Sequence, residues 1–236
     1  MSGMQGKTIL YTGGAGGLGL ETTMHFLDAG ARVVVIDRDE AKMAALAEAA
    51  SAHHAERLLI RDFDLADLSG LKKELGDIQA SFGEFNVVIN NAAIYPSKPF
   101  HEFTVEEHQA VQRVNVDAAI VCVQAALPSM RKNQWGRIIN ITSITFYGGW
   151  ALLAPYVQSK GALVGLARAW AREYGVDGIT ANAVSGQKGN LVSLHDRSSK
   201  ADEHTLAFAV GEIGLAPEIL TDTGLLVAAG REDVIA

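Results

Sequence analysis

Short apolar runs alternate with longer amphipathic runs along most of this 236-residue chain. The short runs are rich in Ile, Val and Leu and nearly continuous in apolarity, which is typical of strands buried on both faces of a parallel sheet. The alternation predicts the α/β class, with a doubly wound parallel sheet and one domain over residues 1–236. We expect strands at 8–12, 32–37, 57–63, 86–91, 137–142 and 179–184, and helices at 18–29, 40–52, 68–82, 105–131 and 155–174.

The net charge and the single cysteine indicate which binding partners and which cellular compartment suit this protein. The formal net charge is -7 and no cluster of Lys and Arg is present, which argues against nucleic acid as a partner. We find no run approaching the roughly 18 apolar residues that span a bilayer, and no signal-peptide pattern at the N-terminus. Cys122 is the only cysteine, which excludes an internal disulfide and suits a reducing compartment. We therefore expect a cytoplasmic protein without a membrane partner, in which Cys122 packs as a small hydrophobe.

A glycine-rich turn, "TGGAGGLG" at residues 12–19, connects the first predicted strand to the first predicted helix. Glycine at 13 and 17 lets the backbone approach a diphosphate, and Gly19 permits close helix–strand packing. The N-terminus of the helix, beginning at Leu18, presents unpaired N–H groups to an anion. This context favours a Rossmann-type dinucleotide site that includes Gly13, Gly17, Leu18 and Gly19. A purely structural turn is the alternative.

Asp37 ends the second predicted strand, about twenty residues beyond the glycines. A carboxylate there can accept hydrogen bonds from the adenosine ribose hydroxyls and repels a 2′-phosphate. Arg38 follows, but the glycine turn itself contains no basic residue that would help bind such a phosphate. We therefore expect NAD rather than NADP as the cofactor. The alternative role for Asp37 is to cap the helix that begins at residue 40.

Further segments follow in an order and spacing that resembles the short-chain dehydrogenase/reductase family over about residues 6–184. The resemblance implies that Asp64 and Leu65 flank the adenine, and that Asn91 belongs to the cofactor site. It also implies a catalytic set of Asn115, Ser143, Tyr156 and Lys160, and no metal. The segments are "TGGAGGLG", "DFDLAD" with Asp64 and Leu65, "NNAA" with Asn91, "VNVDA" with Asn115, "NITS" with Ser143, and "YVQSK" with Tyr156 and Lys160.

Tyr156 and Lys160 are four residues apart on a predicted helix and therefore share one face. A phenol with a pKa near 10 is a poor base at neutral pH, and a nearby ammonium lowers that pKa by roughly 1–3 units. The pair can thus serve as a general acid/base and its activator. Ser143, at a strand end, can orient the substrate oxygen. The alternatives are a packed tyrosine, a solvated lysine and a serine in a turn.

The resemblance assigns two further roles and an activity. Lys160 would also bind the nicotinamide ribose, and Asn115 would help hold a water that relays protons; a satisfied core amide is the alternative for Asn115. The implied activity is hydride transfer between NAD and a secondary alcohol or ketone. Phe146, Tyr147 and Trp150, which follow the fifth predicted strand, favour a cyclic or aromatic substrate, and packing of these rings under the neighbouring loop is the alternative. Two other functions stay open: an NADP-dependent 3-oxoacyl-type reductase, and a non-catalytic dinucleotide-binding sensor or scaffold.

The C-terminal part departs from the family. The usual Pro-Gly after the sixth strand reads Ser185-Gly186 here, and Gly186 is kept as a cofactor-site candidate. We treat residues 185–236 as a substrate loop and divergent tail, with 187–205 as either a lid or a plain loop and 222–231 as faintly similar to a final strand. Because family members pair the helices at 105–131 and 155–174, we expect a homotetramer, with a dimer as the fallback.

Overall fold

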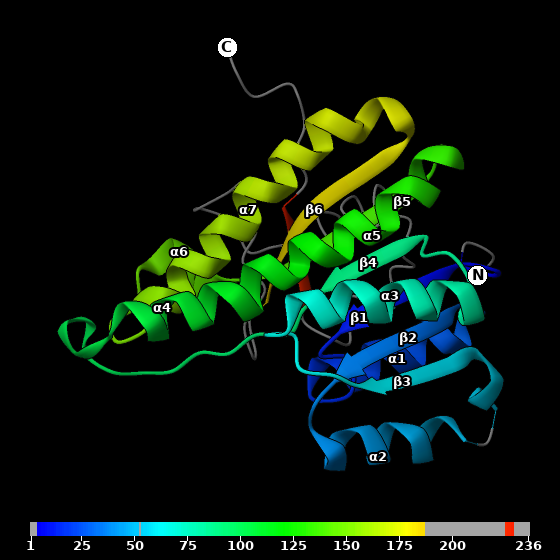
Figure 1. The fold of residues 1–236 in the computed structure, drawn as a ribbon, viewed down its shortest axis with the longest axis horizontal. Coiled ribbons are helices and arrows are strands. Elements are labelled where there is room, and N and C mark those ends of the chain that lie inside the picture. Colours follow the sequence, from blue (N-terminus) through cyan, green and yellow to red (C-terminus); the bar gives the residue numbers. More distant parts are fainter. Residues whose placement is uncertain (1–3, 52, 187–224, 229–236) are drawn as a thin grey trace, which may run out of the picture.

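The computed structural model describes residues 4–51, 53–186 and 225–228 (Figure 1). Six parallel strands and one antiparallel strand form a single sheet in the order β3-β2-β1-β4-β5-β6-β7. The predicted doubly wound α/β fold is therefore confirmed, while the segment at 187–205 lies outside the described residues. The strands are β1 (Thr8–Thr12), β2 (Arg32–Asp37), β3 (Leu58–Asp62), β4 (Val87–Asn90), β5 (Gly136–Ser143), β6 (Ile179–Gly186) and β7 (Leu225–Ala228).

Helices cover both faces of the sheet, as the apolar strands require. Phe26 of α1 and Leu46 of α2 pack into one core, whereas Leu75 of α3 and Val123 of α5 pack into the other. Figure 1 shows α3, α5 and α7 across the near face of the sheet, with α1 behind it. The helices are α1 (Leu18–Asp28), α2 (Glu40–Ala50), α3 (Leu68–Phe82), α4 (Val105–Gln112), α5 (Ala118–Lys132), α6 (Ile144–Gly148) and α7 (Ala154–Tyr174). The short 3₁₀ turns are η1 (Ala55–Arg57), η2 (Phe100–Glu102) and η4 (Gly175–Asp177).

The helix predicted over 105–131 is not one regular helix. A π-helical turn, η3 (Arg113–Asp117), separates α4 from α5 and buries Asn115 and Val116. A π turn accommodates an extra residue without breaking the helix, and such turns are frequent at functional sites. Because the turn takes up the extra residue, Val111, the buried residue of α4, and the buried residues of α5 can all face the core.

The same helical run corrects one sequence-based expectation. The 28 residues Val105–Lys132 contain a window of mean hydropathy 1.2 and are long and apolar enough to cross a membrane by these measures alone. Within the structure 44% of that window is buried, and Cys122, Val123 and Ala126 of α5 pack with Leu71 and Leu75 of α3. A core helix of this kind satisfies the same length and composition criteria.

The sheet topology positions the site. Strands β1 and β4 are neighbours, although their following helices cover opposite faces, so the carboxyl ends of these strands border a crevice. Open α/β sheets bind ligands at such a switch point. Residues that end strands meet along this edge: Thr12 pairs with Asn90 in register, and Ser143 pairs with Gly186.

Candidate active site

Two glycines shape the turn after β1. Gly13 has a φ of 67°, and an added Cβ would lie 2.9 Å from Ala92 Cα. Gly19 leaves no room for a side chain, because a Cβ there would overlap the Gly13 carbonyl and lie 2.7 Å from Gly14 Cα. The first turn of α1 therefore rests directly on the backbone of the glycine turn.

Gly17 is open instead of packed. It occupies the N-cap position of α1 with a φ of 53° and no side-chain cap, and an added Cβ would meet no atom within 4 Å. Gly16 and Gly17 line the cleft, so the start of α1 borders it, and the Gly19 N–H donates to the Gly16 carbonyl at 2.9 Å. A helix N-terminus that borders a cleft in this way fits the diphosphate of a dinucleotide.

Asp37 connects the end of β2 to the glycine turn. Its Oδ2 accepts a hydrogen bond from the Ala15 N–H at 3.2 Å, and its Oδ1 accepts bonds from the N–H groups of Arg38 at 2.8 Å and Asp39 at 3.3 Å. Asp39, not Asp37, caps α2, with its carboxylate accepting from the Lys42 N–H at 3.1 Å. The alternative role of Asp37 as the helix cap is therefore wrong.

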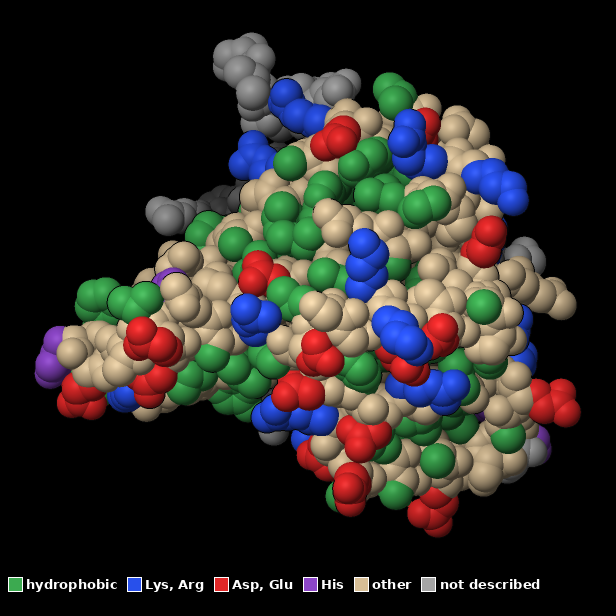
Figure 2. Space-filling view, in the orientation of Figure 1, with side chains coloured by type: hydrophobic (Ala, Val, Ile, Leu, Met, Phe, Trp, Pro, Cys, Tyr) green, Lys and Arg blue, Asp and Glu red, His purple; other side chains and the backbone are tan. Residues whose placement is uncertain are grey.

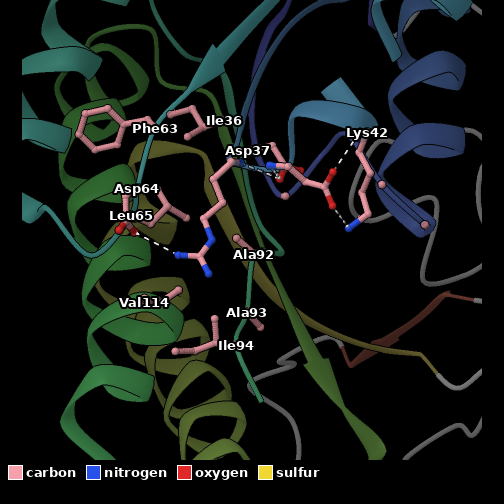
Figure 3. Close-up of a pocket in the computed structure, with 15 residues that line it drawn as sticks. Ile36, Asp37, Lys42, Phe63, Asp64, Leu65, Ala92, Ala93, Ile94 and Val114 are labelled. Atoms are coloured by element: carbon pink, nitrogen blue, oxygen red, sulfur yellow. Dashed lines mark hydrogen bonds and ion pairs between the residues drawn. The ribbon is translucent and has the colours of Figure 1, made fainter. Parts of the chain in front are cut away.

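A cleft of about 570 Å³ runs from Asp37 to Ile94. Figure 3 shows Phe63, Asp64 and Leu65 along one side and Ala92 to Ile94 at the far end. The buried Leu65 offers an apolar wall and Asp64 an exposed carboxylate, which pairs with Arg38 Nη1 at 3.9 Å. Apolar walls with a few polar groups at one end suit a nucleoside.

Asn91 lies beside the cleft wall. Its Nδ2 donates to the Thr12 carbonyl at 3.2 Å and to the Gly13 carbonyl at 2.9 Å, and its own N–H donates to Thr12 Oγ1 at 3.1 Å. This side chain holds the glycine turn against the end of β4. Asn91 therefore lies next to the cleft, and its amide N–H groups are bonded to the glycine turn.

Ser143 and Tyr156 meet at the carboxyl edge of β5. Ser143 is buried, and its Oγ accepts hydrogen bonds from Thr145 N–H at 3.2 Å and Thr145 Oγ1 at 2.9 Å. Burial raises the pKa of the Tyr156 phenol, while a hydrogen bond with the Ser143 side chain opposes that rise. The two hydroxyls are therefore within reach of one substrate oxygen. The increase in the Tyr156 pKa is opposite to the lowering expected from the sequence.

Lys160 lies beside Tyr156, but burial of the phenol itself sets the direction of the Tyr156 pKa shift. Its Nζ lies 5.4 Å from the centre of the Tyr156 ring and donates to the Ile141 carbonyl at 2.7 Å. The residue is 2% exposed, and this burial lowers the pKa of its ammonium to about 8. At Tyr156, burial is the largest cause of the raised pKa, and the neighbouring Tyr95 also raises it.

Asn115 lies in the π turn, with its side-chain amide fully engaged. Oδ1 accepts from the Ile94 N–H at 2.8 Å, and Nδ2 donates to the Ile94 carbonyl and to Ser159 Oγ, both at 3.0 Å. Ser159 Oγ in turn donates to the Tyr156 carbonyl at 2.7 Å. The amide thus joins the segment after β4 to the helix that carries Tyr156.

Sequence reasoning placed Tyr95 only within a candidate pocket wall at residues 94–100, and it missed Lys42. Tyr95 packs edge-on against Tyr156, with ring centres 5.9 Å apart, and its side chain is 67% exposed. Lys42 of α2 lines the cleft beside Asp37. The position of Tyr95 directly after "NNAAI" offered a signal, whereas nothing in the glycine turn indicated a lysine from the next helix.

The end of β6 carries the departure from the usual Pro-Gly. Gly186 pairs in register with Ser143, which places it at the edge where Tyr156 and Ser143 meet. Ser185 is buried, and its Oγ has no hydrogen-bond partner within the described part of the chain. Among the residues with described positions, no group of three His, Cys, Asp or Glu is placed to hold a metal ion.

Comparisons with known proteins agree with this geometry. A family model described as "short chain dehydrogenase" matches residues 7–190. The chain is 34% identical over 227 residues to 2,3-dihydroxy-2,3-dihydro-p-cumate dehydrogenase of Pseudomonas putida, covering 94% of this chain and 88% of that protein. It is 32% identical over 181 residues to D-beta-hydroxybutyrate dehydrogenase of Cupriavidus necator, covering 77% and 70%. A gluconate 5-dehydrogenase of Burkholderia cenocepacia, solved with NADP and tartrate, superposes with a TM-score of 0.72 and 26% identity over 93% of this chain and 87% of that chain.

Proposed function

The chain belongs to the short-chain dehydrogenase family, and we propose that it interconverts a secondary alcohol and a ketone with NAD as the preferred cofactor. The observation that carries this proposal is the meeting of Ser143, Tyr156 and Lys160 at one sheet edge, next to a cleft that fits a dinucleotide. Relatives that act on alcohols of different shapes support the reaction class.

In the proposed mechanism, the protein's residues handle the proton. When bound, the nicotinamide supplies the hydride acceptor or donor. Tyr156 donates its phenolic proton to the carbonyl oxygen during reduction, and takes the hydroxyl proton during oxidation. Ser143 donates a hydrogen bond to the same oxygen and stabilises charge that develops on it. Lys160 is mostly protonated at neutral pH, and its ammonium favours the phenolate that the oxidation direction needs.

Asp37 supports the choice of NAD. Its partly buried carboxylate, oriented by three backbone N–H groups, stands where ribose hydroxyls can donate to it. We propose Gly13, Gly17, Leu18 and Gly19 around the diphosphate, and Lys160 and Gly186 near the nicotinamide end. An NADP-linked reductase is the second candidate, favoured by the NADP in the similar gluconate 5-dehydrogenase structure.

Exposed aromatic side chains support a cyclic or aromatic substrate. Tyr95 is exposed and packs edge-on against Tyr156. Three aromatic residues of the segment after Ser143 are also exposed: Phe146, Tyr147 and Trp150. Exposed aromatic rings next to Tyr156 and in the segment after Ser143 suit a substrate with a ring. The Pseudomonas putida relative is named for a cyclic diol, 2,3-dihydroxy-2,3-dihydro-p-cumate, which has a ring but also polar groups.

A panel of secondary alcohols with NAD, followed by the absorbance of the reduced cofactor, tests the function. Turnover should be highest for cyclic or aromatic alcohols, and Tyr156→Phe should abolish it while sparing affinity for NAD. Tyr174→Phe, at the other end of α7, is the matched control and should keep full activity. Tight NAD binding without turnover on the whole panel would favour a sensor or scaffold, and activity in Tyr156→Phe would refute the assigned role.

We also propose a homotetramer, with a dimer as the alternative. Apolar side chains gather between scattered charges on the face over α5 and α7 (Figure 2), and Val121, Ala125 and Trp170 of these helices are only partly buried. Sedimentation that shows only a 25.1 kDa species would contradict this assembly. Expression as a fluorescent fusion tests the proposed cytoplasmic location.

A further inference from the structure

The short helix α6 follows Ser143 directly, and the Ser143 hydroxyl caps it. Ser143 Oγ accepts a hydrogen bond from the Thr145 N–H at 3.2 Å, and the Thr145 hydroxyl bonds the same oxygen at 2.9 Å. Both residues are buried, with 8% and 6% of their surfaces exposed, so these bonds lie in a region of low dielectric constant. The serine expected to bind the substrate oxygen is therefore also tied into the first turn of the helix that follows it.

Packing of α6 on α7 keeps Thr145 in this place. The Phe146 ring lies on the backbone of Gly161, where an added Cβ would be 2.6 Å from Phe146 Cε2 and 2.8 Å from its Cδ2. Gly161 directly follows Lys160 in α7, and α6 lies against that helix (Figure 1). The first turn of α6 is thus docked on the helix that carries Tyr156 and Lys160.

The donors and acceptors around Ser143 Oγ determine where its proton points. A hydroxyl has one proton and two lone pairs. Thr145 supplies two donors, its N–H and its Oγ1–H, which together occupy both lone pairs. If Ser143 donated to Thr145 instead, the Thr145 proton would have no acceptor among the residues whose positions the structure describes. The other side-chain hydrogen bond of Ser143 is with Tyr156, and it opposes the rise in the pKa of that phenol.

We infer that Thr145 is a positioning residue, whose two donors direct the Ser143 proton toward Tyr156 and the substrate oxygen. This inference rests on the proposed function. When negative charge develops on either oxygen, Ser143 donates to it and Thr145 donates to Ser143, so that the two hydrogen bonds strengthen each other. Without the Thr145 hydroxyl, one lone pair of Ser143 is left empty, and Ser143 becomes a weaker and less directed donor.

Thr145→Val removes the Oγ1–H donor while keeping the backbone N–H and nearly the same shape. With NAD and the best secondary alcohol of the panel, kcat should fall by about tenfold, which is less than the roughly 100-fold or greater loss expected for a direct oxyanion donor. The dissociation constant of NAD should change by less than about twofold. Thr145→Ser keeps the hydroxyl and should restore kcat to within about threefold of the unaltered chain.

A double-mutant cycle with Ser143→Ala distinguishes positioning from a purely structural role. Because Thr145 should act through Ser143, Thr145→Val should change kcat little further once residue 143 is alanine. Thr142→Val is the matched control, since Thr142 is similarly buried and its hydroxyl bonds the Val184 carbonyl at 3.0 Å. It should lower stability as Thr145→Val does, yet leave kcat within about twofold.

Titration of the Tyr156 phenol provides a readout that needs no turnover. In protein labelled on its tyrosine rings, NMR follows each phenol, and the Tyr156 signal is the one absent from Tyr156→Phe. Thr145→Val should raise the pKa of Tyr156, because it weakens the Ser143 hydrogen bond that opposes the effect of burial.

Two results would overturn the inference and leave the proposed function standing. One is an unchanged Tyr156 pKa in Thr145→Val, and the other is an equal loss of kcat with and without the Ser143 hydroxyl. Conversely, a raised Tyr156 pKa in a protein that turns over no alcohol would uphold the positioning role and remove the proposed activity.

Discussion

The side-chain amide of Asn115 bonds both backbone polar groups of Ile94, accepting from its N–H at 2.8 Å and donating to its carbonyl at 3.0 Å. The same amide donates to Ser159 Oγ, which bonds the Tyr156 carbonyl. One buried residue in a π turn therefore holds the segment that leads to Tyr95 and the helix turn that carries Tyr156.

Asn115→Ala should lower both stability and activity. The substitution leaves the Ile94 N–H and carbonyl and the Ser159 hydroxyl without this partner, which should cost about 2–4 kcal/mol in the free energy of unfolding. Urea denaturation measures that loss. Asn133→Ala, at the exposed end of α5, is the control and should change the free energy by less than about 0.5 kcal/mol. Equal effects of the two variants would contradict the bridging role.

Gly19→Ala should push α1 away from the glycine turn. The new methyl group would overlap the Gly13 carbonyl, so we expect a loss of about 1–3 kcal/mol in stability and weaker binding of NAD. Gly76→Ala provides a matched comparison, because it lies in α3 where an added Cβ meets nothing within 4 Å. There, helix propensity predicts a gain of about 0.5–1 kcal/mol. A harmless Gly19→Ala would disprove the close packing.

Lys160 should make stability depend on pH. Burial lowers the pKa of its ammonium from 10.5 to about 8, so between these values the unfolded chain binds a proton that the folded chain lacks. The free energy of unfolding therefore rises with pH across this window, by about 3 kcal/mol in all, and this contribution is constant below about pH 8. Urea unfolding at pH 7.5 and 9.5 should show a rise of about 2 kcal/mol relative to Lys160→Met. If the free energies of unfolding of the two proteins changed with pH in parallel, this prediction would be wrong.

Cys122 should be unreactive in the folded protein. It is fully buried on α5, and burial raises the pKa of its thiol to about 12, so almost no thiolate forms at neutral pH. An aromatic disulfide reagent should label it only after urea is added. Ser51→Cys, at an exposed position after α2, should react at once and serves as the positive control. Rapid labelling of the unaltered chain would show that the α3–α5 core opens readily.

Much of the fold could be predicted because continuous apolarity marks buried parallel strands. The bounds predicted for β1, β2 and α3 coincide with the observed ones. The π turn could not be predicted, because one extra residue hardly changes the apolar periodicity of a 27-residue segment. The five-residue α6 is too short to show a period, and sequence alone does not indicate that β7 runs antiparallel.

Only part of the candidate site could be predicted from the sequence. Residues at strand ends, such as Ser143 and Asp37, could be placed because topology brings those ends together. The direction of the Tyr156 pKa shift could not be predicted, because it depends on how deeply the phenol itself is buried. The contact of Lys42 with Gly16 joins a helix to a turn more than twenty residues earlier, and no local pattern encodes it.

The π turn gives the α4–α5 run one place where a change in length can be absorbed. Because a π turn holds one residue more than an α-helical turn, removing one residue from Arg113–Asp117 would restore an ordinary helical repeat and leave Cys122, Val123 and Ala126 facing the core. Removing one residue from the regular part of α5 would instead rotate every later side chain by about 100° about the helix axis. A one-residue deletion should thus be tolerated better within the π turn than in α5, provided that Asn115 and its bonds to Ile94 and Ser159 are kept.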